Sequence, residues 1–275
     1  MTARTRCPAK INLFLAVGPK DARGWHPLRT VFQAVDLCDS LTVSLSDRDE
    51  FTTDVSWLPE DNSVSQAVRA LRREIPVPPL RIKLEKRIPA KAGLGGGSSD
   101  AAGILRAVPE LAGAAIPETV LRSIALDLGA DVPFFLVGGR ARGEGYGQIL
   151  TPLPDPAERF YLVVKPEVDC PTGEMYARLD LRARSFRDFG DEEDYHNDFS
   201  EVAPGECHRA MEHLSVCGAT GVGLSGSGSA VFGSFGDHTA TLTGAALMRS
   251  MGYEHVWPTC TLSRTASLAV DVDIG

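Results

Sequence analysis

The fold of this 275-residue chain is decided by the stretch Pro89-Ala90-Lys91-Ala92-Gly93-Leu94-Gly95-Gly96-Gly97-Ser98-Ser99-Asp100-Ala101-Ala102. It follows the strand-like alternation of Leu80, Ile82 and Leu84, and it leads into a helical pattern in which Ser and Asp can cap. Glycines allow positive φ angles and close approach to a ligand, and amides at a helix N-terminus bind phosphate. The stretch therefore predicts a phosphate-binding loop. The alternative, a flexible turn, is disfavoured by the placement between a strand and a helix.

Two common nucleotide loops are excluded by the residues themselves. A Walker A loop needs Gly-Lys followed by Ser or Thr, and no such tripeptide follows these glycines. Gly221, Gly223 and Gly226 have the Gly-x-Gly-x-x-Gly spacing of a dinucleotide fold, but they follow a helical pattern. They also lack an acidic residue about 20 positions further on. Neither a P-loop nor a Rossmann site is expected.

Apolar periodicity outlines further elements of the N-terminal half. Ile11, Leu13, Leu15 and Val17 alternate with Lys10, Asn12 and Phe14, which predicts a strand with Lys10 and Asn12 on the same face. Leu41, Val43 and Leu45 predict another strand. Helices are predicted from Asn62 and from Pro117 to about Leu128, where Gly129 is the stop signal.

A domain boundary is expected near Pro152-Leu153-Pro154-Asp155-Pro156, because prolines this dense interrupt a regular element. We therefore divide the chain into residues 1–154 and 155–275, two mixed α+β domains. In the second part, residues 188–201, with Asp191-Glu192-Glu193-Asp194, predict a solvated loop. The other expected elements there are strands at 161–164, 230–232 and 262–270 and helices at 206–217 and 240–251.

Composition limits the class of protein. Lys and Arg total 28 and Asp and Glu 36, so the net charge is 28 − 36 = −8. This charge disfavours a general nucleic-acid or membrane-surface binder but leaves room for a local basic pocket. No apolar run approaches the roughly 18 residues of a membrane span, and no signal peptide is visible. We expect a cytoplasmic protein whose six scattered cysteines are mostly packed thiols.

Three separated segments resemble the signature motifs of the GHMP kinase superfamily. They are Pro8-Ala9-Lys10-Ile11-Asn12-Leu13, the glycine run of residues 89–102, and Gly223-Leu224-Ser225-Gly226-Ser227-Gly228-Ser229. Three further segments strengthen the resemblance and extend it over nearly the whole chain: Arg23-Gly24-Trp25-His26, Leu128-Gly129-Ala130-Asp131-Val132-Pro133-Phe134-Phe135 and Asn197-Asp198-Phe199. The resemblance implies an ATP-dependent kinase of a small alcohol. It also implies an N-terminal domain like domain 2 of ribosomal protein S5, a ferredoxin-like C-terminal domain and an active site between them.

The resemblance also assigns the residues of the chemistry. Asp131 would be the catalytic aspartate and Lys10 its partner, although a structural ion pair is the alternative. The ATP phosphates, bridged by Mg2+, would be surrounded by Pro89, Ala90, Lys91, Ala92, Gly93, Leu94, Gly95, Gly96, Gly97, Ser98 and Ser99. Ser99 is also a candidate magnesium ligand. Asn62 would lie near the nucleotide base, and it suits a helix N-cap equally well.

The implied acceptor is the C2 hydroxyl of cytidine diphosphate methylerythritol, in the methylerythritol phosphate route to isoprenoids. Asn12, Trp25, His26 and Tyr176 would bind this substrate, with Trp25 stacking on the cytosine and His26 bonding its edge. A monomer or weak homodimer without nucleic acid or membrane partners is expected. One alternative is a kinase of homoserine or a mevalonate-like alcohol, which Trp25-His26 disfavours. The other is a nucleotide-binding module without turnover, which the presence of Lys10 and Asp131 disfavours.

Overall fold

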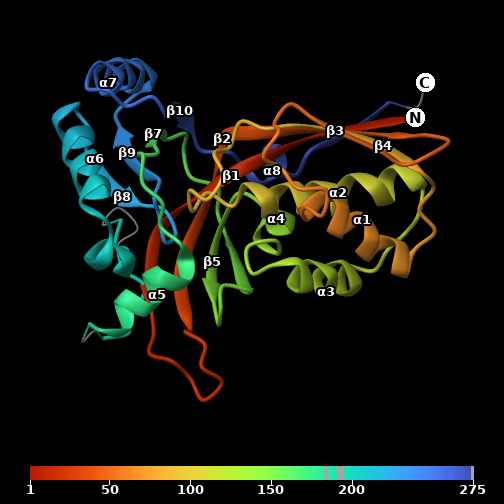
Figure 1. Ribbon diagram of the computed structural model, residues 1–275, viewed down its shortest axis with the longest axis horizontal. Helices are drawn as coiled ribbons and strands as arrows, with labels where there is room; N and C mark the ends of the chain where they lie inside the picture. The colour runs from red at the N-terminus through yellow and green to blue at the C-terminus, as the bar shows by residue number, and fades with distance from the viewer. Residues whose placement is uncertain (183–184, 191–194, 274–275) are drawn as a thin grey trace.

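The computed structural model describes residues 1–182, 185–190 and 195–273, which form two β-sheets with helices packed on each (Figure 1). The first sheet has the order β11-β1-β2-β4-β3, and β5 adds to β2 and carries β6. Its strands are β1 (Thr2–Val17), β2 (Leu28–Leu45), β3 (Glu50–Thr53), β4 (Leu80–Glu85), β5 (Arg140–Glu144), β6 (Ile149–Leu153) and β11 (Val270–Asp273). Both chain ends therefore lie at one end of this sheet.

The β1–β2 ribbon joins the two sheets. The alternation at residues 11–17 is confirmed as strand, but the strand begins at Thr2 and pairs with β2 up to Val17. Its first half belongs to the core of the first sheet, whereas Leu15 and Val17 are buried among the residues of the second sheet. Lys10 and Asn12, which lie between these halves, are consequently placed where the two sheets meet.

Helices cover one face of the first sheet (Figure 1). They are α1 (Ser63–Glu74), α2 (Gly96–Ala112), α3 (Glu118–Leu128), the short α4 (Phe134–Val137) and α8 (Arg264–Leu268). The expected ends are confirmed for α1, capped by Asn62, and for α3, which runs from the N-cap Pro117 to Gly129. The N-cap of α2 is Gly95, so the prediction that Ser or Asp caps this helix is wrong.

The second sheet has a ferredoxin-like topology, as the resemblance implies. Its strands are β7 (Phe160–Val164), β8 (Gly221–Leu224), β9 (Val231–Phe235) and β10 (Val256–Cys260), all antiparallel in the order β10-β7-β9-β8. The helices are α5 (Thr172–Asp180), the 3-10 helix η1 (Asp198–Val202), α6 (Gly205–Val216) and α7 (His238–Ser250). The predicted strands at 161–164 and 230–232 and both predicted helices are confirmed.

The structure corrects three expectations. Pro152 lies inside β6, because β6 is an edge strand and needs no N–H from Pro152 on its open side. Residues 262–270 are not one strand, since they contain α8. The segment 188–201 is not loop throughout, because η1 begins at Asp198, while Asp191, Glu192, Glu193 and Asp194 lie outside the described residues.

The division into residues 1–154 and 155–275 stays a proposal. The strands of the second sheet all lie between residues 160 and 260. After them the chain returns to the first sheet, where β11 pairs with β1 through Thr2–Asp273 and three further residue pairs. No helix among the described residues has the length and apolar character to cross a membrane.

Candidate active site

The three motif segments meet at the junction of the two sheets. Lys10 of β1 donates its backbone N–H to Leu94 O (3.0 Å). The hydroxyl of Ser225 donates to Gly93 O (3.0 Å), and Gly226 N donates to Asn12 Oδ1 (2.8 Å). The strand, the glycine loop and the third motif are thus bonded to one another, although Asn12 and Gly226 are 214 residues apart in the chain.

The close approach of these segments explains two of the glycines. Gly93 and Gly95 have φ angles of +76° and +73°, a region that other L-residues rarely occupy. A Cβ on Gly93 would lie 2.1 Å from the carbonyl oxygen of Ser225. One on Gly95 would lie 2.9 Å from the ring of Phe135. Glycine is therefore needed where the second motif touches the third and where α2 begins.

The glycine loop lines a cavity of about 340 Å³ in front of the N-terminus of α2. Residues 88–98 supply most of the wall, and Trp57, Leu58, Ser63, Lys86 and Asp100 complete it. The first N–H groups of a helix have no partner within the helix and favour an anion. This cavity can hold a chain of phosphates against backbone amides, and the binding of ATP by Pro89 to Ser98 stays a prediction.

The other two predicted nucleotide residues have different surroundings. Asn62 is the N-cap of α1: its Oδ1 accepts from Val64 N (2.9 Å) and Ser65 N (3.1 Å), and its Nδ2 donates to Pro59 O (2.8 Å). Its amide is therefore occupied by the cap that holds Trp57 and Leu58 beside the loop. Ser99 is fully buried, and its Oγ has no hydrogen-bond partner among the described residues.

Lys10 and Asp131 form an ion pair next to the glycine loop. Lys10 Nζ lies 3.5 Å from Asp131 Oδ2, and the two side chains are 4% and 34% exposed. Asp131 follows the end of α3 and precedes Pro133, so its backbone is irregular and the carboxylate reaches the surface. A buried ammonium beside an accessible carboxylate is suited to a reaction in which charge moves at the carboxylate.

A hydrogen-bond chain holds the ammonium of Lys10 in place. Lys10 Nζ donates to Asn12 Oδ1 (2.7 Å), and Asn12 Nδ2 donates to Thr30 Oγ1 (2.8 Å). Thr30 in turn donates to Phe14 O (2.8 Å). Asn12 is 3% exposed, and its Oδ1 also accepts from Gly226, so it acts on Lys10 and on the third motif as a positioning residue.

Three of the four predicted substrate residues, Trp25, His26 and Tyr176, lie around the turn of the β1–β2 ribbon, whereas Asn12 lies beside Lys10. His26 Nδ1 donates to Gly18 O (2.8 Å), and His26 Nε2 lies 3.3 Å from Asp180 Oδ1. Tyr176 stacks on the imidazole of His26, with ring centres 4.9 Å apart. Trp25 is 65% exposed, and the ring near it is that of Tyr146, at 6.2 Å. The structure thus brings His26 and Tyr176 together and pairs Trp25 with an aromatic residue that the sequence reasoning missed.

Asn197 and Asp198 connect the second sheet to the site. Asn197 Nδ2 donates to Leu224 O (2.8 Å) and Gly226 O (2.9 Å), on either side of the third motif's first turn. Asp198 Oδ2 accepts from Val17 N (2.7 Å) at the end of β1. This pair of residues therefore fixes the third motif relative to the strand that carries Lys10.

A buried charge cluster supports the glycine loop from behind and was also missed from the sequence. Lys86 Nζ contacts Asp39 and lies 2.6 Å from Asp100 Oδ2, and all three side chains are nearly inaccessible. With one cation for two carboxylates, burial and the neighbouring Asp39 raise the pKa of Asp100 to about 7. Lys86 follows β4 directly. A lysine at the end of a strand and just before a glycine loop is the sequence signal that could have predicted this charge cluster.

The stability of the protein should depend on the proton of Asp100. A raised folded-state pKa means that the folded state holds more protons than the unfolded state between about pH 4 and pH 7. The contribution is therefore favourable at low pH and is lost as pH rises through about 7. Asp100→Asn removes this dependence, so its Tm relative to wild type should be about 3 °C higher at pH 8 than at pH 6.

Differential scanning fluorimetry at the two pH values checks this prediction. Asp127→Asn, at an exposed position of α3, is the matched control. It should shift Tm by the same amount at both pH values. An Asp100→Asn shift that is the same at pH 6 and pH 8 would show that Asp100 does not titrate in this range and would contradict the prediction.

Known proteins resemble this chain in sequence and in structure. The family described as GHMP kinases N terminal domain matches residues 62–139. The 4-diphosphocytidyl-2-C-methyl-D-erythritol kinase of Solibacter usitatus is 39% identical over 271 residues, which cover 90% of this chain and 85% of that protein. The protein of the same name from Ralstonia nicotianae is 40% identical over 243 residues and covers 83% of each chain.

Solved structures give the same picture of the fold. A crystal structure of 4-(cytidine 5'-diphospho)-2C-methyl-D-erythritol kinase aligns with a TM-score of 0.82 and 31% identity over 94% of this chain and 98% of that one. The homoserine kinase of Cytophaga hutchinsonii aligns with a TM-score of 0.69 and 20% identity over 96% of each chain, a likeness in fold alone. The two-domain α+β fold that the motifs implied is confirmed.

Proposed function

Since the chain belongs to the GHMP kinase family, and within it to the 4-diphosphocytidyl-2-C-methyl-D-erythritol kinases, we propose that it transfers a phosphoryl group from ATP to the C2 hydroxyl of 4-diphosphocytidyl-2-C-methyl-D-erythritol. This is a step of the methylerythritol phosphate pathway to isoprenoid precursors. The observation that carries the proposal is the ion pair of Lys10 and Asp131, at 3.5 Å, beside a glycine loop at a helix N-terminus.

Asp131 acts as the base of the transfer. Its carboxylate is accessible, whereas its partner Lys10 is buried, so the substrate approaches from the side of Asp131. The oxygen of the C2 hydroxyl attacks the γ-phosphorus, its proton passes to an Asp131 carboxylate oxygen, and the bond between the γ-phosphorus and the bridging oxygen of ADP breaks. Orientation of the hydroxyl in line with that bond is the main requirement of phosphoryl transfer.

Lys10 stabilises the charge that develops during the transfer. Its ammonium is held by Asn12 at 2.7 Å, so it is oriented before the substrate arrives. A fixed cation in a buried site stabilises a transition state more than a solvated one does, because it needs no reorganisation.

The nucleotide binds along the glycine loop with its phosphates at the N-terminus of α2. The fit with Mg2+ rests on the buried hydroxyl of Ser99, which has no hydrogen-bond partner among the described residues and lies in the first turn of that helix. No group of three or more His, Cys, Asp or Glu side chains in the described part of the chain is arranged as a metal site. The ATP phosphates, with Ser99, would therefore hold the ion, which would supply positive charge to neutralise the phosphates.

The cytidine end of the substrate lies at the turn of the β1–β2 ribbon. Trp25 offers an exposed aromatic face, and Asp21 Oδ1 accepts from its backbone N–H (3.1 Å). The rings of His26 and Tyr176 stack on each other next to this region. Asn12 reaches the substrate through the second N–H of Nδ2, because its other polar groups are bonded within the protein.

Turnover with candidate alcohols tests this function. The protein is incubated with Mg-ATP and 4-diphosphocytidyl-2-C-methyl-D-erythritol, homoserine or mevalonate, and ADP release is followed. We expect turnover with the cytidylated alcohol, and phosphorus NMR should locate the new phosphate on its C2 oxygen. Turnover with homoserine alone, or with no alcohol, would refute the proposal.

Trp25→Ala should weaken substrate binding selectively. Stacking of a base on an aromatic side chain is worth about 1–3 kcal/mol, so KM for the cytidylated alcohol should rise about tenfold or more while kcat changes little. KM for ATP in the same variant is the internal control, because Trp25 is not part of the glycine-loop cavity. An unchanged KM for the cytidylated alcohol would place the cytosine elsewhere.

The remaining expectations are part of the same proposal. The enzyme would work in the cytoplasm as a monomer or weak homodimer, and it would bind a small-molecule substrate without nucleic acid or membrane partners. The net charge of −8 supports the exclusion of nucleic acid.

A further inference from the structure

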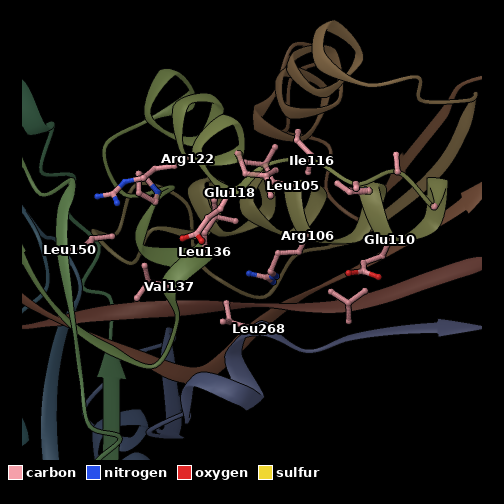
Figure 2. Close-up of a pocket in the computed structure, with 17 residues that line it drawn as sticks. Leu105, Arg106, Glu110, Ile116, Glu118, Arg122, Leu136, Val137, Leu150 and Leu268 are labelled. Carbon is pink, nitrogen blue, oxygen red and sulfur yellow. The ribbon is translucent and has the colours of Figure 1, made fainter.

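A second cavity lies at the opposite end of α2 from the glycine loop. It measures about 890 Å³ and is enclosed by the second half of α2, the connection 113–116, α3, α4 and the segment from α8 to β11 (Figure 2). Nothing in the proposed reaction uses it. Its lining combines the charged side chains of Arg106, Glu110, Glu118 and Arg122 with a set of aliphatic side chains, among them Leu105, Ile116, Leu121, Leu136, Val137 and Leu268. The aliphatic part of a cavity of this size suits an apolar chain of about ten carbon atoms.

A guanidinium without a counter-ion lies in the wall of this cavity. Arg106 Nη1 donates to Phe135 O (2.6 Å), and Nη2 donates to Arg6 O (3.1 Å) and Thr5 Oγ1 (3.2 Å). Figure 2 shows this side chain reaching from α2 toward β1. No carboxylate of the described residues is within ion-pair distance of it, and its Nε is buried without a partner.

The positive charge of Arg106 favours the binding of an anion in this cavity. Burial of a charge is costly unless the charge is paired, and burial lowers the pKa of Arg106. The three acceptors of Arg106 are neutral oxygens, which leave its charge uncompensated, and one N–H of Nη1 stays available. The acidic residues of the lining, Glu110 and Glu118, are exposed and form no ion pair with Arg106.

We propose that this cavity binds an amphipathic anion, that is, an aliphatic chain carrying a carboxylate or a phosphate, with the head group at Arg106 and the chain among the aliphatic residues of α2, α3 and α4. The ligand is distinct from both substrates of the kinase reaction, since neither the glycine loop nor Asp131 lines the cavity.

Binding of the anion in the second cavity should change the kinetic properties of the active site. Arg106 holds the carbonyl of Phe135, and the ring of Phe135 lies against Gly95, the N-cap of α2 in the glycine loop. Pro133, which lines the cavity, is two residues from Asp131. An anion that shifts Arg106 therefore acts on both the nucleotide loop and the segment of the catalytic carboxylate. We expect saturating ligand to change KM for ATP at least twofold.

Fluorescence titration with 11-(dansylamino)undecanoate tests the proposal on the intact protein. One equivalent should bind saturably, and decanoate or decyl phosphate should displace it at least tenfold more effectively than uncharged 1-decanol. The more effective of the two anions identifies the head group. Equal displacement by 1-decanol, or no saturable binding up to 1 mM of the probe, would overturn the proposal.

Two variants test separately whether probe binding depends on the charge of Arg106 and on the space of the cavity. Arg106→Met should weaken binding at least tenfold, and Leu136→Trp, which fills the cavity and leaves Arg106 in place, should do the same. Arg73→Met, at an exposed position in the last turn of α1, is the matched control and should bind as wild type does. If Arg106→Met does not fold, Leu136→Trp still decides, because unweakened binding in that variant would place the probe elsewhere.

Discussion

Asp131→Asn should lower kcat by about 10²–10⁴-fold, the usual contribution of a general base. Asparagine has nearly the size of aspartate but cannot accept the proton of the acceptor hydroxyl, and it leaves the buried ammonium of Lys10 without its anionic partner. Because the carboxylate is not part of the glycine-loop cavity, the dissociation constant of ATP should hardly change. Steady-state kinetics and an ATP titration by calorimetry measure the two quantities separately.

The control for this variant is Asp127→Asn, at the exposed end of α3 four residues upstream. It removes the same charge from the same segment and should retain wild-type kcat. Near-wild-type turnover of Asp131→Asn would show that the ion pair is structural, which is the alternative that the sequence leaves open.

Lys10→Met should lower kcat by about 10²–10³-fold, the cost of removing one fixed donor at a developing negative charge. Methionine nearly keeps the length of the side chain but removes the charge, including the cation–π contact of Nζ with Phe32, whose ring centre is 5.6 Å away. Asn12 Oδ1 still accepts from Gly226 N in the variant, so the third motif should keep its place. Kinetics and thermal unfolding of the same preparation distinguish a lost charge from a lost fold.

Lys83→Met, an exposed lysine on β4 that pairs with Glu85, is the matched control and should leave kcat unchanged. The double variant Lys10→Met/Asp131→Asn gives a sharper result. Residues that act as a unit are not additive, so the double variant should be little slower than the slower single variant. Fully multiplicative losses would mean that the two side chains act independently.

Local patterns in the sequence were sufficient for most of the elements that carry the site. The alternation around Ile11 placed Lys10 and Asn12 on one face, and the structure bonds them to each other at 2.7 Å. Pro117 and Gly129 correctly marked the start and stop of α3, because start and stop signals act through the backbone of a few neighbouring residues. The glycine run was correctly predicted to lead into a helix, which is α2.

Predictions from local sequence patterns were wrong where the structure depends on contacts between residues that are far apart in the sequence. The prolines at 152–156 predict an interruption, but Pro152 lies in β6, which pairs with β5 and with no other strand of the described residues, so a proline is tolerated there. Residues 264–268 were assigned to a strand, whereas they form α8, whose contacts with α4 come from another part of the chain. Lys86 was overlooked because its charge partners, Asp39 and Asp100, are brought to it by the sheet and by α2.

The sequence by itself determined the family, the glycine loop and the identity of the ion pair, because motif residues in a fixed order carry that information. Only the tertiary structure decided what these residues touch. In the structure the amide of Asn62 caps a helix, Tyr176 stacks on His26, and Arg106, beside the second cavity, has no carboxylate of the described residues within ion-pair distance. The physical reason is that hydrogen bonds, burial and charge depend on distances in space, and here the decisive partners, such as Asn12 and Gly226, are separated by 214 residues.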